Sequence, residues 1–173
     1  MNDVLKRTLT PVPVRYLAVP GRPYFVVTFP RRAGVPTAAR LATRFGPMRF
    51  LFSQVLATRE VEGGHRLETQ RYAYKLTRAS DSQPFVRWEY DRPKSPRVKR
   101  CRHHLQGPIR LDLGTRSVSL DEMHLPTGWV TFEEVIRFCI VDLGAQPRSA
   151  DWNRVLLDSY ELFKSQFAPL GEV

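Results

Sequence analysis

Cysteine is rare in this sequence, and long apolar runs are missing. The two cysteines, Cys101 and Cys139, lie far apart and belong to no Cys-x-x-Cys pair, which predicts free thiols in a reducing compartment. No stretch approaches the roughly 18 consecutive apolar residues of a membrane-spanning helix, and residues 1–8 lack the apolar centre of a secretory signal. We therefore expect a soluble, cytoplasmic protein that makes no contact with a membrane.

Motifs that hold a cofactor or a metal are also missing. Gly63-Gly64 is a turn signal without the Gly-Lys-Ser/Thr that completes a phosphate-binding loop. The carboxylates form no cluster of the kind that binds Mg²⁺. Four potential zinc ligands follow no spacing of known geometry: Cys101, His103, His104 and His124. The sequence thus predicts neither a metal nor a cofactor.

What the sequence does contain is positive charge, and this charge is unevenly distributed. The chain has 173 residues, 42% of them hydrophobic, which suffices for one globular domain with a core. Its net charge is +10. Residues 1–120 hold 23 basic and 8 acidic side chains, whereas residues 121–173 hold 4 basic and 9 acidic side chains. This segregation favours a part that binds a polyanion joined to a part with another task. A basic protein that is merely rich in Arg is the alternative interpretation.

The charge is densest between Asp91 and Arg110, where no acidic residue follows Asp91. Cations held so close together repel one another unless an anion is bound, so nucleic acid is the partner that this segment predicts. Two more cations lie on one face of a preceding strand. The predicted nucleic-acid-binding residues are Arg92, Lys94, Arg97, Lys99, Arg100, Arg102 and Arg110, together with Arg71 and Lys75.

Residue periodicity predicts an α+β fold with a mainly antiparallel sheet. Residues 1–13 are expected to form a flexible arm ahead of a single domain at 14–173. Turn signals and alternation indicate a hairpin over 14–29 and a meander with strands at 67–78, 85–91, 98–106, 109–113 and 116–120. Residues 37–45 are expected to form a short helix, and the apolar run in 48–61 fits a buried strand or a helix equally well.

The last third of the chain changes to a helical period. Apolar residues recur at helical spacing over 132–143, and Thr131 with Glu134 matches a capping box. A second amphipathic helix is predicted over 150–167. We expect the two C-terminal helices to pack on one face of the sheet, over aromatic residues that are more typical of a core than of a base-stacking platform: Tyr72, Tyr74, Trp88 and Tyr90.

Metal-independent cleavage of a phosphodiester needs a base, an acid and a cation for the charge that develops at phosphorus. The two adjacent histidines are the candidate acid or base, although an extended strand sends them to opposite faces, so that at most one reaches the site. A tighter loop there removes this restriction. Arg87 and Arg102 are expected to stabilise the phosphate. Asp91 or Glu89 is expected to orient an imidazole, while a plain cross-strand ion pair is the competing explanation. The predicted catalytic residues are His103, His104, Arg87, Asp91 and Glu89.

The order of these segments resembles the TumE-type toxins of prokaryotic toxin–antitoxin modules. In that family a strand with Tyr-x-Tyr, here Tyr72-Ala-Tyr74, precedes a strand that ends in an aromatic residue and Asp, here Tyr90-Asp91. A basic segment with adjacent histidines and a glycine follows, here 102–107, before a helix like that at 131–143. The resemblance covers roughly residues 66–143, and it implies a ribonuclease that is neutralised by an antitoxin protein encoded beside it.

These observations predict an RNA-binding protein that acts as a metal-independent endoribonuclease toxin of a toxin–antitoxin module. Two alternatives remain open. One is a non-catalytic nucleic-acid-binding subunit of a larger complex. The other is a protein-interaction module whose basic face docks an acidic partner.

Overall fold

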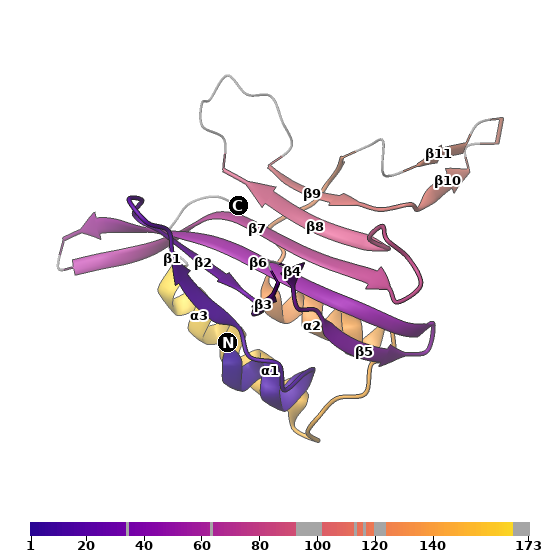
Figure 1. Cartoon of the computed structure of the whole chain (residues 1–173), viewed down its shortest axis with the longest axis horizontal. Helices are drawn as coiled ribbons and strands as arrows, with labels where there is room; N and C mark the ends of the chain where they lie inside the picture. The colour runs from indigo at the N-terminus through magenta and orange to yellow at the C-terminus, as the bar shows by residue number, and fades with distance from the viewer. Residues whose placement is uncertain are drawn as a thin grey trace.

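The computed structural model describes residues 1–33, 35–62, 64–92, 102–112, 114–115, 117–119 and 124–167. Within these ranges, eight strands form one antiparallel sheet, and three helices accompany it (Figure 1). The predicted α+β class is therefore confirmed. The strands of the sheet are β1 (Arg15–Ala18), β2 (Tyr24–Thr28), β5 (Ala39–Thr43), β6 (Gly46–Val61), β7 (Gly64–Arg78), β8 (Val86–Asp91), β9 (His103–Gln106) and β12 (Leu125–Pro126).

The strands follow the order β1-β2-β6-β7-β8-β9-β12, and β5 also pairs with β6. The run from β6 to β9 is the predicted meander, and β1 with β2 is the predicted hairpin. Two short ribbons stand apart from this sheet: β3 (Arg31–Arg32) pairs with β4 (Val35–Pro36), and β10 (Arg110–Asp112) pairs with β11 (Ser117–Ser119). The meander thus ends at β9, and Arg110–Asp112 and Ser117–Ser119 form a separate ribbon instead of continuing it.

The segment that fitted a strand or a helix equally well is strand β6. It pairs with β7 along most of its length, with a register shift between Val55 and Leu56. Phe50 lies opposite Leu76 and Phe52 opposite Tyr74, and all four side chains are buried. Pairing with β7 therefore settles a choice that the local pattern leaves open.

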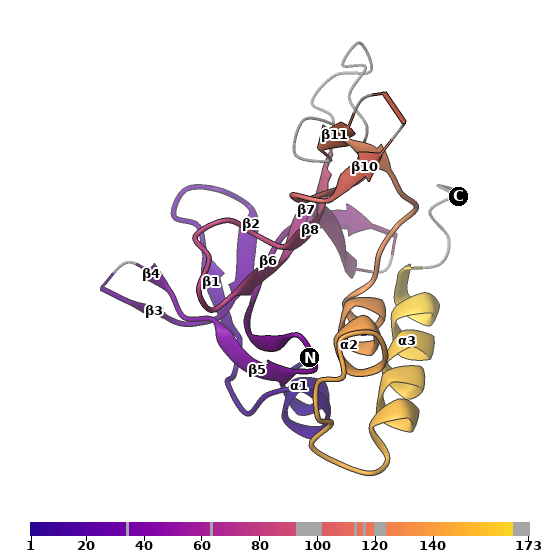
Figure 2. The ribbon, with the colours of Figure 1, turned by 90° about the vertical axis from the view of Figure 1, so that its right-hand side faces the viewer.

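Helices α2 (Phe132–Val141) and α3 (Trp152–Phe167) lie together on one side of the sheet, as predicted (Figure 2). The capping box is present: Glu134 N donates to Thr131 Oγ1 at 3.2 Å, and Thr131 N donates to Glu134 Oε2 at 2.6 Å. Phe132 packs against Phe52 with ring centroids 5.0 Å apart. The core lies between this helix pair and the sheet. None of the described helices has the length and apolar character needed to cross a lipid bilayer.

The expectation of a flexible arm at residues 1–13 is wrong, because helix α1 (Asn2–Thr8) occupies most of it. Val4 and Leu5 are buried in the main core and anchor the helix there. The Asn2 side chain accepts from Val14 N at 2.7 Å, which ties the helix to the start of β1. Thr8 O accepts from Arg148 N at 3.0 Å, so the N-terminal residues also bind the loop before α3.

The short helix expected over 37–45 is also wrong, because this segment contains strand β5. Ala39 and Leu41 are buried while Arg40 and Ala42 are exposed, which is the two-residue alternation of a strand. Gly46 has a φ of +93° at the hairpin to β6, a conformation that glycine adopts without strain. The Thr43 hydroxyl donates to Gly46 O at 2.7 Å and closes the turn.

Candidate functional site

Strands β7, β8 and β9 present two chemically different faces. Side chains alternate along a strand, so Tyr72, Tyr74 and Tyr90 all point toward the helices and are buried, as predicted for core aromatics. We call the side of the sheet turned away from α2 and α3 the outer face. Two rows of register partners cross it: Lys75 opposite Arg87, and Ala73 opposite Glu89, which is in turn opposite His104.

His104 lies at the centre of a polar cluster on the outer face. It is 9% exposed, and its Nε2 is 3.6 Å from Glu89 Oε2. Its ring packs edge-to-face on His124, with centroids 4.6 Å apart. His124 is exposed, and its Nε2 lies 3.1 Å from the amide nitrogen of Gln106. Since an amide nitrogen can only donate, that imidazole nitrogen accepts. The fold therefore brings together two imidazoles from segments far apart in the sequence.

Glu89 links this imidazole pair to a cation. Its second oxygen, Oε1, is 3.4 Å from Lys75 Nζ, so the carboxylate lies between an ammonium group and an imidazole. The carboxylate is thus within ion-pair distance of both groups. We call Lys75, Arg87, Glu89, His104 and His124 the outer-face site.

Arg87 adds to the outer-face site a cation that forms no ion pair with the described residues. It lies directly opposite Lys75 in the sheet register, an arrangement in which like charges destabilise a strand pair. Its Nε is buried and has no hydrogen-bond partner among the described residues. Because the two like charges repel each other, an anion bound beside them would relieve the repulsion between Arg87 and Lys75.

His103 points to the opposite face, as alternation along an extended strand predicts. It stacks on Tyr90 with centroids 4.4 Å apart and contacts Trp129 at 5.2 Å. Tyr72 accepts from Val130 N at 3.1 Å, and its hydroxyl lies 3.1 Å from Nδ1 of His103. Burial raises the pKa of Tyr72 to about 12, so its hydroxyl keeps a proton to donate to that nitrogen. His103 is thus packed among core aromatics, away from His104.

The other predicted site residues are scattered. Asp91 and Arg71 lie opposite each other at the exposed end of the β7–β8 pair, and Asp91 contacts neither histidine within the described structure. Arg92 forms an ion pair with Glu68, Nη1 to Oε2 at 2.5 Å, so it is not the unopposed cation that the sequence suggests. Arg102 is exposed just before β9, and Arg110 is exposed in the separate ribbon. Four predicted nucleic-acid-binding residues lie outside the described residues, as does Cys101: Lys94, Arg97, Lys99 and Arg100.

The residue that sequence reasoning did not place in the site is His124. It stands in a segment without periodicity, 20 positions after His104, so only the pairing of β12 with β9 brings it back to the sheet. The register sets Pro126 opposite His104 and Leu125 opposite Leu105. The sole sequence signal was that His124 is one of 4 histidines in the chain.

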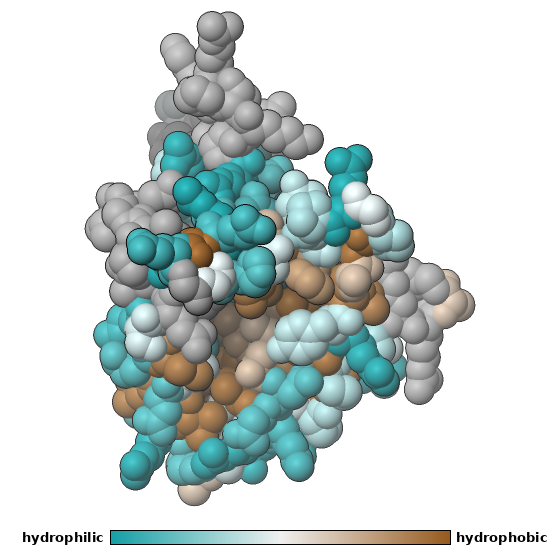
Figure 3. Space-filling model, turned by 90° about the vertical axis from the view of Figure 1, so that its left-hand side faces the viewer, coloured by the Kyte–Doolittle hydropathy of each residue, from teal (hydrophilic) through white to brown (hydrophobic). Residues whose placement is uncertain are grey.

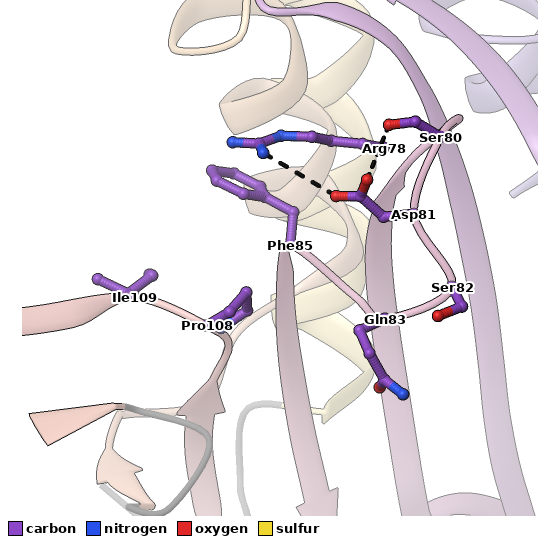
Figure 4. Close-up of a pocket in the computed structure, with 8 residues that line it drawn as sticks. All are labelled: Arg78, Ser80, Asp81, Ser82, Gln83, Phe85, Pro108 and Ile109. Carbon is purple, nitrogen blue, oxygen red and sulfur yellow. Dashed lines mark hydrogen bonds and ion pairs between the residues drawn. The ribbon is translucent and has the colours of Figure 1, made fainter.

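Two other surface features lack such a convergence of reactive groups. A depression at the β7–β8 turn is lined by Arg78, Asp81 and Phe85. Its two charged side chains compensate each other, because Arg78 pairs with Asp81 and also lies over the Phe85 ring (Figure 4). Apolar surface lies in a hollow on the side of the molecule seen in Figure 3. Strand β1, at one edge of the sheet, exposes Tyr16 and Leu17. Among the described residues, none of these surfaces brings two imidazoles together as the outer-face site does.

In the portion of the chain that the structure describes, no group of three or more His, Cys, Asp or Glu residues is arranged to hold a metal ion. No protein-family model matches the chain, and no curated protein or solved structure is significantly similar to it. The chemistry of the outer-face site is therefore the basis for a functional proposal.

Proposed function

We propose that the protein binds RNA on the outer face of its sheet and cleaves it as a metal-independent endoribonuclease. The observation that carries this proposal is the contact of two imidazoles, with ring centroids 4.6 Å apart, beside the Glu89 carboxylate. Lys75 and Arg87 supply positive charge next to them. The sequence resemblance adds the proposal that the protein is a toxin restrained by an antitoxin protein.

The proposed reaction is an internal transesterification of RNA. The 2′-oxygen forms a bond to phosphorus while the bond from phosphorus to the 5′-oxygen breaks. One imidazole of the His104–His124 pair accepts the proton of the 2′-hydroxyl, and the other, in its protonated form, donates a proton to the departing 5′-oxygen. The products are a 2′,3′-cyclic phosphate and a free 5′-hydroxyl, and proton exchange with water restores both imidazoles.

The remaining residues of the outer-face site have supporting roles. Lys75 and Arg87 stabilise the negative charge that builds on the phosphate oxygens, and both cations lie on the same face as the two imidazoles. Glu89 orients the His104 ring through its contact with Nε2. His103 has no part in the reaction, since its ring is held by Tyr72, Tyr90 and Trp129 on the other face.

The chemical outcome tests this function. Purified protein is incubated in excess EDTA with an unstructured RNA and with the same sequence lacking 2′-hydroxyls. We expect cleavage of the RNA alone, with fragments ending in 2′,3′-cyclic phosphate. We also expect His104→Ala to slow cleavage by about 100-fold or more while its unfolding midpoint shows that it is folded. Cleavage of the 2′-deoxy strand, or a folded His104→Ala variant with full activity, would contradict the proposal.

A nucleic-acid-binding protein without chemistry is the second candidate, and the low exposure of His104, 9%, favours it. In that case the outer face binds the phosphate backbone through its cations alone. RNA would then be retained in a gel-shift experiment without being cut, and His104→Ala would leave its affinity unchanged.

A further inference from the structure

The outer face carries a second pair of like charges that directly oppose each other. Arg40 of β5 is the register partner of Arg49 of β6, just as Lys75 of β7 is the partner of Arg87 of β8. Alternation places the four side chains on the outer face, because their neighbours Leu41, Phe50 and Leu76 point into the core. Like charges in directly opposed positions destabilise a sheet, so two such pairs on adjacent strands need an explanation.

Carboxylates compensate this charge only in part. Lys75 reaches Glu89 at 3.4 Å, but Arg40, Arg49 and Arg87 form no ion pair with any described residue. Arg49 donates through Nη2 to the backbone oxygen of Asp81, yet its Nε, like that of Arg87, is buried without a partner in the described structure. Two repulsive pairs of cations are therefore left for an anion to compensate.

The four cations form a row that crosses the strands. They occupy consecutive strands β5, β6, β7 and β8, and with a strand spacing of about 4.8 Å the row spans about 14 Å. Arg49 lies opposite Thr77, two positions from Lys75, so the row passes from one opposed pair to the next without meeting a carboxylate. At its other end, Gln106 lies opposite Arg87 and contacts His124. The row thus leads into the outer-face site.

We propose that Arg40, Arg49, Lys75 and Arg87, which we call the cationic row, hold the backbone of single-stranded RNA and deliver it to the outer-face site. This inference rests on the proposed function and extends it by naming the substrate class and its path. One row of cations matches one line of phosphates, whereas a duplex presents two backbones separated by a groove. An unpaired strand can also turn its 2′-hydroxyl into line with the bond that breaks, which the regular geometry of A-form RNA opposes.

Binding of 2′-O-methyl RNA, which offers no 2′-hydroxyl and cannot be cleaved by this chemistry, tests the cationic row separately from catalysis. The double variant R40Q/R49Q is compared with R22Q/R154Q, which removes the same charge from an exposed turn and from α3. We expect R40Q/R49Q to weaken single-strand binding by about tenfold or more at low salt. The slope of log K against log salt is negative, and its magnitude should decrease by about 1.4, since each phosphate neutralised on a single strand contributes about 0.7.

The outcomes separate the two proposals. Equal affinity of R40Q/R49Q and R22Q/R154Q would overturn the cationic row while leaving the proposed function intact, and tighter binding of a 2′-O-methyl duplex would overturn the single-strand assignment. A wild-type protein that binds neither form would end both proposals. If R40Q/R49Q does not fold, Arg40→Gln alone, at an exposed position, is expected to reduce the magnitude of the slope by about half as much.

Discussion

At the scale of single residues, Glu68 links charge to stability. The residue is 8% exposed, and its carboxylate accepts from Arg59 Nη1 at 3.0 Å and from Arg92 Nη1 at 2.5 Å. The hydrogen bond from Arg59 and then that from Arg92 lower the pKa of Glu68, although burial opposes this shift. A carboxylate whose pKa is lower in the folded state stabilises the fold above its ordinary pKa, and this stabilisation is lost as the pH falls through the lowered value.

We therefore predict that Glu68→Gln lowers the free energy of unfolding by about 1–3 kcal/mol at pH 7. Below the lowered pKa of Glu68 the difference should shrink, because the wild-type carboxyl is then protonated as well. Urea unfolding of both proteins at pH 7 and in strong acid measures this. Equal destabilisation at both pH values would show that charge is not the cause.

The adjacent histidines show what an alternating residue pattern can predict and what it cannot. Alternation along an extended strand predicts that His103 and His104 point to opposite faces, and they do. The same pattern cannot tell which face holds reactive partners, because Glu89 and His124 are brought to His104 only by sheet pairing. Asp91 and Glu89 are equally good sequence candidates for a carboxylate beside an imidazole, and the structure places Glu89 near His104 and Asp91 opposite Arg71.

At the scale of elements, the β8–β9 pair depends on one close backbone approach. A Cβ added at Gly107, just after β9, would lie 2.6 Å from the backbone oxygen of Phe85 and 3.4 Å from Cα of Val86. Both atoms belong to the backbone at the start of β8, so relief of the clash requires movement of the strand. Gly107 therefore sets how closely β9, with His104, packs on β8.

Gly107→Ala is predicted to lower the free energy of unfolding by about 1–3 kcal/mol. Gly128→Ala is the matched control, because a Cβ there meets nothing within 4 Å. Thermal unfolding of the two variants measures the difference. If Gly107→Ala unfolds at the same temperature as Gly128→Ala, the close approach does not limit the packing of β9.

Elements with a full local pattern could be predicted, and those that depend on distant partners could not. Helix α2 has both its apolar spacing and its capping box in the sequence. Strand β5 is only five residues long, and its pairing with β6 decides its conformation. Helix α1 is two turns long and is stabilised by burial of Val4 and Leu5, since so short a helix does not persist alone in water.

At the scale of the whole molecule, the two faces of the sheet differ in composition: one forms the apolar core and the other carries charged side chains. The helix-covered side buries Phe50, Phe52 and Tyr74 in the core. The outer face carries the cationic row and the outer-face site, and this arrangement accounts for part of the net charge of +10. Charge composition predicts that such a surface exists, but its location depends on strand register, which composition does not contain.

The most direct test of the account is the RNA cleavage rate of His124→Ala measured beside His65→Ala, a control that removes an exposed histidine from the distant β6–β7 turn. We predict that His65→Ala keeps the wild-type rate and that His124→Ala loses about 100-fold or more. A wild-type rate in His124→Ala would contradict the assignment of the two-imidazole site.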